Sequence, residues 1–253
     1  MYDKEVRVRS GGTVHITDSS VRARERIEKG EAVLAYLHEG NRQEDFSFCR
    51  YACEDVEELS EGYLDKVYRR QKGLPVLILE TERCLIRETT VEDVDAFYKI
   101  YAEPSVTEFM EPLYEDPEEE RAYARDYIEK VYAFYDFGIW TVTDRGSGEV
   151  IGRAGICYRE GYDDPEIGFM IAVPWQGRGL ATEVCRAVLD YAKRELGFDR
   201  VLAFVQPENT ASRKICRKLG MICEENVELQ GEIYEKYVWS FGSFSLEKVH
   251  PGC

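Results

Sequence analysis

The order of apolar and polar positions divides the chain into two parts with different patterns. In the first part, Thr13 to Thr17 alternates like a half-buried strand, and the polar run Asp18 to Ser20 supplies N-cap residues for a helix over Val21 to Lys29. The apolar run Ala32 to Leu37 predicts a buried strand, and Asp55 to Gln71 predicts a second helix. The first 74 residues therefore predict a small βα-βα module.

From Leu77 the pattern becomes that of a larger domain. Residues 77–90 predict one strand interrupted by a polar turn, and helical periodicity follows at about 91–103 and 117–135. Later strands are predicted at 138–144, 149–159, 166–173, 201–205 and 232–241, and later helices at 183–196 and 209–219. Because strands come first and then alternate with helices, the sequence predicts an α/β fold with a mixed sheet, in two domains at 1–74 and 75–253.

Composition and charge narrow the classes of partner. Hydrophobic residues make up 44% of the 253 positions, which is enough for a packed core. The formal net charge is −16, so we expect neither nucleic acid nor a membrane as a partner. The eight cysteines form no Cys-x-x-Cys pair, and we expect no metal site. The chain has no apolar run of about 18 residues and no signal-peptide pattern, which predicts a cytoplasmic protein.

The clearest chemical signal lies between the predicted strand 166–173 and the helix that follows it. Residues 173–183 read VPWQGRGLATE, with Gly177 and Gly179 just before the helix. The first turn of a helix has N–H groups without intrahelical partners, and glycine lets a ligand approach the backbone closely. These features together predict a cradle for an anion. An ordinary strand-to-helix turn would use the same glycines, so spacing alone leaves both interpretations open.

Two common phosphate-binding motifs do not fit this stretch. A P-loop needs a lysine after its second glycine, and a dinucleotide fingerprint needs a third glycine where this chain has Thr182. The remaining pattern, Gln176 to Ala181, resembles the Gln/Arg-x-x-Gly-x-Gly/Ala signature of the Gcn5-related N-acetyltransferases (GNAT). NTASRKICRKLGM at 209–221 is similar to a second element of that family. Residues 81–110 resemble the opening of the branch that acetylates ribosomal-protein N-termini, which also includes polyamine acetyltransferases.

The resemblance implies the GNAT fold, acetyl-CoA as cosubstrate, and a set of binding groups. In the family the signature receives the pyrophosphate on main-chain amides, and the end of the preceding strand holds the pantetheine arm. Carried over to this sequence, the cofactor-binding residues are Ile171, Val173, Gln176, Gly177, Arg178, Gly179, Leu180, Ala181 and Asn209. A basic cluster would lie near the ribose phosphate or form a solvated helix face; it consists of Arg213, Lys214, Arg217 and Lys218.

Acetyl transfer needs a proton acceptor for the amine and a proton donor for the thiolate leaving group. Many relatives place a tyrosine seven residues after the asparagine, but this chain has Cys216 there. Ser212 matches the serine proposed as the donor in the ribosomal branch, so we assign it that role. Glu166 is the first candidate for the base, with Tyr158 and Glu160 as rivals. A structural role for Glu166 and a water path to no single base stay open.

The acceptor is expected to be a primary amine, such as a protein N-terminus, that attacks the thioester directly in a ternary complex. Ten acids between Glu103 and Glu129 would attract a cationic amine, or they form a solvated helix face. Two alternative functions stay open: acetylation of a polyamine or aminoglycoside, and an acyl-CoA-binding sensor without catalysis. Because such transferases often pair, we include a homodimer among the expected partners.

The first 74 residues resemble half of a Rossmann-like sheet, in the manner of the C-terminal half of haloacid-dehalogenase phosphatases. Those enzymes need an Asp-x-Asp nucleophile on an earlier strand, and no such motif precedes this one. We therefore predict no phosphatase activity and interpret this part as an accessory module.

Overall fold

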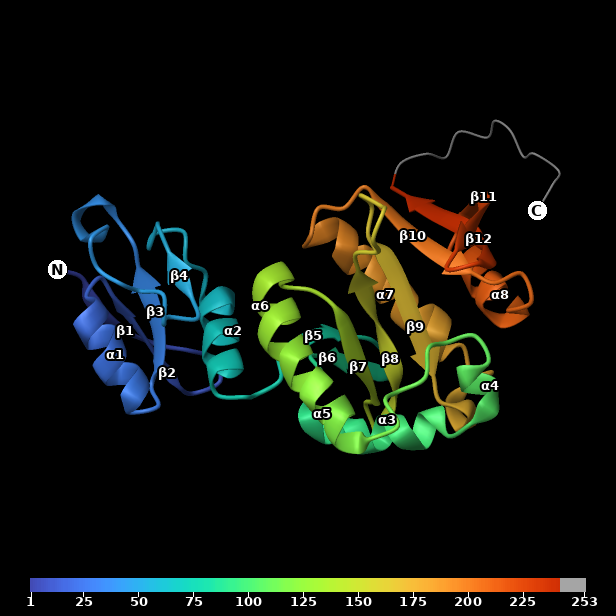
Figure 1. Ribbon diagram of the computed structural model, residues 1–253, viewed down its shortest axis with the longest axis horizontal. Helices are drawn as coiled ribbons and strands as arrows, with labels where there is room; N and C mark the ends of the chain where they lie inside the picture. Colours follow the sequence, from blue (N-terminus) through green and yellow to red (C-terminus); the bar gives the residue numbers. More distant parts are fainter. Residues whose placement is uncertain (242–253) are drawn as a thin grey trace. The chain divides into compact units, whose positions relative to one another are not determined.

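The computed structural model describes residues 1–241 and divides the chain into two compact units (Figure 1). The first unit is Met1–Val76, and the second begins at Leu77. The sequence placed this boundary two residues earlier, and the predicted end of the second domain at 253 lies outside the described residues. Each unit has its own sheet, so each is described by itself.

The first unit is a four-stranded sheet with two helices. Its elements are β1 (Asp3–Arg7), β2 (Thr13–Thr17), α1 (Ser20–Glu28), β3 (Ala32–Tyr36), the 3-10 turn η1 (Glu39–Asn41), β4 (Ala52–Cys53) and α2 (Glu61–Gln71). Strands β2, β3 and β4 are parallel, and β1 is antiparallel to β2. The sequence missed β1 and β4 because their mostly exposed side chains carry no apolar pattern. The second helix begins at Glu61 instead of Asp55, since Ser60 caps it by accepting the N–H of Tyr63.

The carboxyl edge of this parallel sheet is where a Rossmann-like fold binds an anion at a helix N-terminus. Here the protein's own carboxylate lies at that position, because Glu44 Oε2 accepts the main-chain N–H of Ser20 at 2.6 Å. Asp18 precedes Ser20 by two residues, and its carboxylate lies 3.3 Å from His38 Nε2. A phosphate there would meet the carboxylate of Glu44, which already accepts the N–H of Ser20.

The second unit is an eight-stranded sheet. In the order of the sheet, its strands are β11 (Ile222–Leu229), β12 (Glu232–Ser240), β10 (Arg200–Val205), β9 (Glu166–Ile171), β8 (Val150–Cys157), β7 (Ile139–Asp144), β6 (Cys84–Arg87) and β5 (Leu77–Glu80). All neighbours are antiparallel except β9 and β10. The mixed α/β class predicted from the sequence is confirmed.

Two strand predictions in this unit were wrong. Residues 77–90 form two antiparallel strands, β5 and β6, because the polar turn at 81–83 reverses the chain. The sequence also missed β11, whose side chains are largely exposed and polar and which is defined by its main-chain pairing with β12.

Helices cover both faces of the large sheet. They are η2 (Val91–Asp93), α3 (Val94–Tyr101), α4 (Pro104–Thr107), α5 (Pro117–Asp126), the π-helix η3 (Tyr127–Val131), α6 (Tyr132–Tyr135), η4 (Val173–Trp175), α7 (Leu180–Arg194) and α8 (Thr210–Lys218). Within residues 1–241, no helix is both long enough and apolar enough to cross a bilayer.

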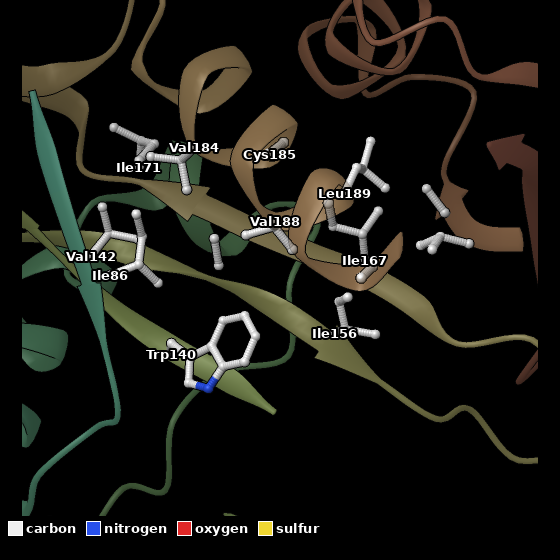
Figure 2. Close-up of a cluster of buried hydrophobic side chains, with 14 of the residues drawn as sticks. Ile86, Trp140, Val142, Ile156, Ile167, Ile171, Val184, Cys185, Val188 and Leu189 are labelled. Atoms are coloured by element: carbon white, nitrogen blue, oxygen red, sulfur yellow. The ribbon is translucent and has the colours of Figure 1, made fainter. Parts of the chain in front are cut away.

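Helix α7 packs its apolar side against the sheet and forms the main core (Figure 2). Val184, Cys185 and Val188 are fully buried on this helix and meet side chains from β6 to β9. Trp140 of β7 is the largest side chain buried there. Burial of each such aliphatic side chain contributes about 1.5–3 kcal/mol, so this face fixes α7 and the turn before it.

On the other face, a buried carboxylate joins η2 to the sheet. Asp93 is only 4% exposed, and its two oxygens each accept from Arg87 at 2.7 Å. The same carboxylate accepts the N–H of Thr90 and the hydroxyl of Thr141. Burial acts to raise the pKa of Asp93, but these hydrogen bonds and the charge of Arg87 outweigh it and hold the pKa below its usual value.

Asp93→Asn removes the charge but keeps the side chain's shape. Because Arg87 would then be half-buried without its counter-charge, we expect the free energy of unfolding to fall by about 3 kcal/mol at neutral pH. The matched control is Asp95→Asn, which breaks the ion pair with Arg121 on an aspartate that is 69% exposed. That change should cost at most about 1 kcal/mol. Urea unfolding followed by circular dichroism measures both.

Wild type and Asp93→Asn also allow a test of how stability depends on pH. A carboxyl whose folded pKa is lowered stabilises the fold fully above its unfolded pKa of about 3.9 and loses this contribution as the pH falls through the folded pKa. The difference in unfolding free energy between wild type and Asp93→Asn should therefore narrow below about pH 4. A difference that stays constant down to pH 3 would contradict the role given to this carboxylate.

Candidate active site

The site lies where the two parallel strands β9 and β10 separate. Their register contains one pair, Leu202 with Glu166, next to a hydrogen bond from the Leu202 N–H to the Pro165 carbonyl at 2.8 Å. In the part of the chain that the structure describes, the ladder does not continue beyond this pair. The N–H of Ala172 donates to β8, and alternate residues face opposite neighbours, so the main chain of Phe169 and Ile171 faces the gap.

The glycine turn connects the end of β9 to the start of α7. Gly177 and Gly179 have φ values of 75° and 81°, a backbone region that side chains other than glycine rarely adopt. Gly179 is the N-cap of α7 and has no side chain to cap the helix. The first N–H groups of the helix therefore have no side-chain acceptor at the cap. A Cβ at Gly177 would meet nothing within 4 Å. The turn thus offers donors and open space for an anion.

Gln176 ties this turn to the strand. Its side-chain Nε2 donates to the carbonyl of Ile171 at 2.8 Å, and its main-chain N–H donates to the carbonyl of Val173. The strand ends at Ile171, and Val173 begins the 3-10 turn η4, two residues earlier than the sequence predicted. The main-chain groups of Ile171 and Val173 are expected to hold the pantetheine arm, and the carbonyls of both residues already accept hydrogen bonds from Gln176.

Arg83 holds the turn from the other side, a role that the sequence analysis missed. This residue lies in the reversal between β5 and β6, and its Nη1 donates to the carbonyl of Arg178 at 2.9 Å. Its Nε and main-chain N–H both donate to Glu183 in the first turn of α7. These contacts tie the carbonyl of Arg178 and the first turn of α7 to the same guanidinium. The residues are 95 and 100 positions apart, and no local motif signals such a contact.

Arg178 itself stacks on the ring of Trp175, 5.0 Å from the ring centroid. Both residues line a shallow depression of about 490 Å³ beside the turn, together with Arg83 and Leu180. Leu180 is buried against the core and Ala181 is half-buried, so the side chains at these two positions anchor the helix while their N–H groups belong to its first turn.

The second predicted element is the start of α8. Asn209 is the N-cap, and its Oδ1 accepts the N–H of Ser212 at 3.0 Å, which leaves its Nδ2 as the donor for a ligand. Ser212 is half-buried in the first turn of the helix. Cys216 is fully buried in the main core, and burial raises the pKa of its thiol to about 12. At that pKa the thiol stays protonated and unreactive at neutral pH.

The basic cluster on α8 is smaller than the sequence suggested. Arg213 turns inward, where its Nε donates to the buried carboxylate of Glu235 at 2.8 Å and its Nη1 donates to the carbonyl of Pro207. Tyr237 donates to the same carboxylate. Lys214, Arg217 and Lys218 are exposed and remain as surface charges.

Glu166 lies at the point where β9 and β10 separate, and it is 9% exposed. Its Oε2 accepts from Arg159 Nε at 2.6 Å. Burial raises the pKa of this carboxyl above its usual value, although the charge of Arg159 opposes the shift. Of its rivals for the role of base, Tyr158 packs among the rings of Tyr135, Phe137 and Phe198, and Glu160 is exposed. The assignment of a base stays a prediction.

The gap and the glycine turn lie in a segment that matches a known protein family. A family model described as an acetyltransferase (GNAT) domain matches residues 83–222, more than half of the chain. This chain belongs to the GNAT acetyltransferase family. The matched segment contains the glycine turn, Glu166, Asn209 and Ser212.

Individual relatives agree with this assignment. The protein YkkB of Bacillus subtilis, which is uncharacterised, is 32% identical over 148 residues, 56% of this chain and 84% of YkkB. The ribosomal protein uS5-alanine N-acetyltransferase of Escherichia coli is 26% identical over 162 residues, 59% of this chain and 80% of that enzyme. A solved ribosomal L7/L12 α-N-protein acetyltransferase in complex with coenzyme A has a TM-score of 0.55 and 15% identity, over 65% of this chain and 98% of that one. This last likeness concerns the fold.

As a GNAT member the chain is an N-acetyltransferase, and the resemblance stated from its sequence is confirmed. The family uses acyl-CoA donors and amine acceptors. The turn fits a donor of this kind because its uncapped N–H groups and the open space at Gly177 suit a diphosphate.

Removing Arg83 tests how much the shape of the turn depends on its contacts. In Arg83→Gln we expect the turn to lose its preorganised shape and the Kd for acetyl-CoA to rise about tenfold. The Kd for acetyl-pantetheine, which lacks the diphosphate, should hardly change. Arg194→Gln removes the same charge from the exposed far end of α7 and is the matched control. If Arg83→Gln raised the Kd for acetyl-CoA and for acetyl-pantetheine equally, the residue would not act through the turn.

Proposed function

We propose that this GNAT enzyme transfers the acetyl group of acetyl-CoA to a primary α-amine, such as a protein N-terminus, by direct attack in a ternary complex. The observation that carries the proposal is the uncapped helix N-terminus of α7 beside a gap in the sheet. Acetyl-CoA supplies an activated thioester when bound. The chain must bind its diphosphate, orient its arm, accept the proton of the amine and donate one to the thiolate.

The binding part falls to the turn and to α8. The N–H groups of Gly177 to Ala181 receive the diphosphate, and Arg178 adds a positive charge beside it. The N–H groups of Ile171 and Val173 orient the pantetheine arm, since Gln176 binds their carbonyls. Asn209 uses its Nδ2 for the same arm, because its Oδ1 caps α8. In this assignment Gln176 shapes the turn and does not touch the donor.

For protonation of the thiolate, Ser212 is the best candidate on this chain. Cys216 stands where many relatives have a tyrosine, but it is fully buried against α7. The main-chain N–H of Ser212 is already bound to Asn209, so its hydroxyl is the group left to act. The hydroxyl donates a proton as the sulfur leaves.

The candidate general base is already engaged by an arginine, which favours an α-amine as acceptor. An α-amine with a pKa of about 7.7–8.0 is made neutral at pH 7 for about 1–1.4 kcal/mol, whereas a lysine-like amine of pKa 10.4 costs about 4.6 kcal/mol. The buried carboxylate nearest the gap, Glu166, is bound to Arg159. An acceptor that needs little help with its proton fits such a site best.

The acidic segment between Glu103 and Glu129 supports a second candidate, a cationic polyamine. Nine of its ten acids are exposed, and Glu120 is buried with its carboxylate accepting the N–H of Tyr114. Asp116 caps α5, and Asp126 pairs with Lys130. The exposed remainder attracts cations in general, so this segment raises the local concentration of any positively charged acceptor.

The first experiment measures donor binding by isothermal titration of acetyl-CoA into wild type and Gly179→Trp. The tryptophan is strained at a φ of 81° and fills the turn, so we expect binding to be lost. Gly197→Trp is the matched control, since Gly197 has a φ of 74° with nothing within 4 Å at the opposite end of α7. That variant should bind like wild type.

Release of free CoA with an acceptor panel then identifies the amine. The panel contains a peptide with an N-terminal alanine, the same peptide acetylated at its N-terminus with an internal lysine, spermidine and an aminoglycoside. We expect the free α-amine to be preferred at least ~10-fold in kcat/KM. Preference for spermidine would select the second candidate. Binding without turnover on any amine would make the chain an acyl-CoA sensor and overturn the proposal.

Ser212→Ala tests the proton donor. Alanine keeps the N–H that donates to Asn209, so acetyl-CoA should bind with unchanged Kd while kcat falls about 10²-fold or more. Ser212→Thr restores a hydroxyl and should recover most of the rate. A Ser212→Ala enzyme with the wild-type kcat would remove this residue from the chemistry.

A further inference from the structure

Beyond its single register pair with β9, strand β10 presents main-chain groups that need another partner. The N–H of Phe241 donates to the carbonyl of Asp199, so odd-numbered residues of β10 face β12. Alternation then directs the N–H of Phe204 toward β9, two residues past the Leu202 pair. In a continuous ladder a β9 carbonyl would accept this N–H. Here the strands separate, and the group needs a different acceptor.

The carboxylate of Glu166 is the group that faces this N–H. The main-chain N–H of Phe204 acts to lower the pKa of the carboxyl, and Arg159 Nε donates to its Oε2 at 2.6 Å. The guanidinium of Arg159 in turn lies over the ring of Phe204, 5.2 Å from its centroid. Glu166, Arg159 and Phe204 therefore form a closed set of three contacts that spans β9, the loop after β8 and β10. We call it the gap strut.

These contacts bear on how the carboxylate can act. A general base must present a lone pair to the amine, but Oε2 of this carboxylate already accepts from Arg159 Nε at 2.6 Å. Taking up a proton would also weaken a largely buried ion pair, in which one partner would lose its counter-charge. The same contacts suit a group that takes the place of a missing main-chain acceptor at the point where the strands separate.

We propose that Glu166 is a positioning residue, which keeps β9 and β10 apart at a fixed spacing so that the gap receives the donor's arm, and that it is not the general base. The inference rests on the proposed function for the location of the arm. It replaces the role of base that the sequence suggested, and it assigns a partner role to Arg159, which the sequence did not single out.

Hydrogen exchange tests the strut without any substrate. In wild type the amide of Phe204 should exchange slowly, and peptides covering residues 200–206 should report this by mass spectrometry. Glu166→Gln keeps an oxygen acceptor and should retain most of the protection. Glu166→Ala removes the acceptor and should speed exchange at this amide by about tenfold or more. Unchanged exchange in Glu166→Ala would overturn the strut.

Binding and turnover separate the strut from a base. A strut predicts that Glu166→Ala and Arg159→Gln each raise the Kd for acetyl-CoA by about tenfold, and that the double variant is no worse than either, because both act through one unit. It also predicts a kcat for Glu166→Gln within about threefold of wild type, whereas loss of a base would lower kcat by about 10²–10⁴-fold. The control is Glu228→Gln, an exposed acid on β11. A collapse of kcat in Glu166→Gln with unchanged Kd would restore the base.

The two proposals fail in different ways. If wild type does not bind acetyl-CoA, the proposed donor site is wrong, yet exchange at Phe204 still reports on the strut. If wild type binds and turns over but the Kd of Glu166→Ala and Arg159→Gln is unchanged, the donor site stands and the strut is wrong.

Discussion

The separation of β9 from β10 is the constraint on which the rest of the site depends. A parallel pair normally extends along both strands, and here it consists of one register pair. On its outer side β10 has six register pairs with β12, so it is held mainly by that strand. The gap exposes main-chain groups of both strands, which the protein must either satisfy itself or leave for a ligand. In the roles proposed above, Glu166 serves the first purpose beside Phe204, and the main chain of Ile171 serves the second.

Much of the fold was readable from the sequence because its signals are local. The apolar stripe of α7, the hairpin of β7 and β8, and the glycine turn depend on residues within one turn or strand of each other. Gly177 and Gly179 were recognisable since few other residues adopt their backbone angles. Strands β1, β4 and β11 were missed for the opposite reason: their side chains are exposed, and only pairing with a neighbour defines them.

The candidate site was readable only where its residues lie in one segment. Gln176 to Ala181 and Asn209 were identified through their resemblance to elements of a known family, but the partners that hold them come from elsewhere. Arg213 was counted in a basic cluster for the ribose phosphate or for solvent, and its inward direction became visible only with Glu235 on β12. A charged side chain has the same letter in the sequence whether it meets water, a phosphate or a buried carboxylate, so its role follows from the three-dimensional neighbours.

The contact of Arg83 with Arg178 and Glu183 has a consequence for the order in which the enzyme assembles. The partners are about a hundred residues apart, and closing so long a loop costs entropy before the contact can repay it. On the ribosome, the arginine is made well before the turn that it holds. The turn therefore reaches its final shape late, once β5, β6 and α7 have come together, and a nascent chain passes through most of its synthesis without it.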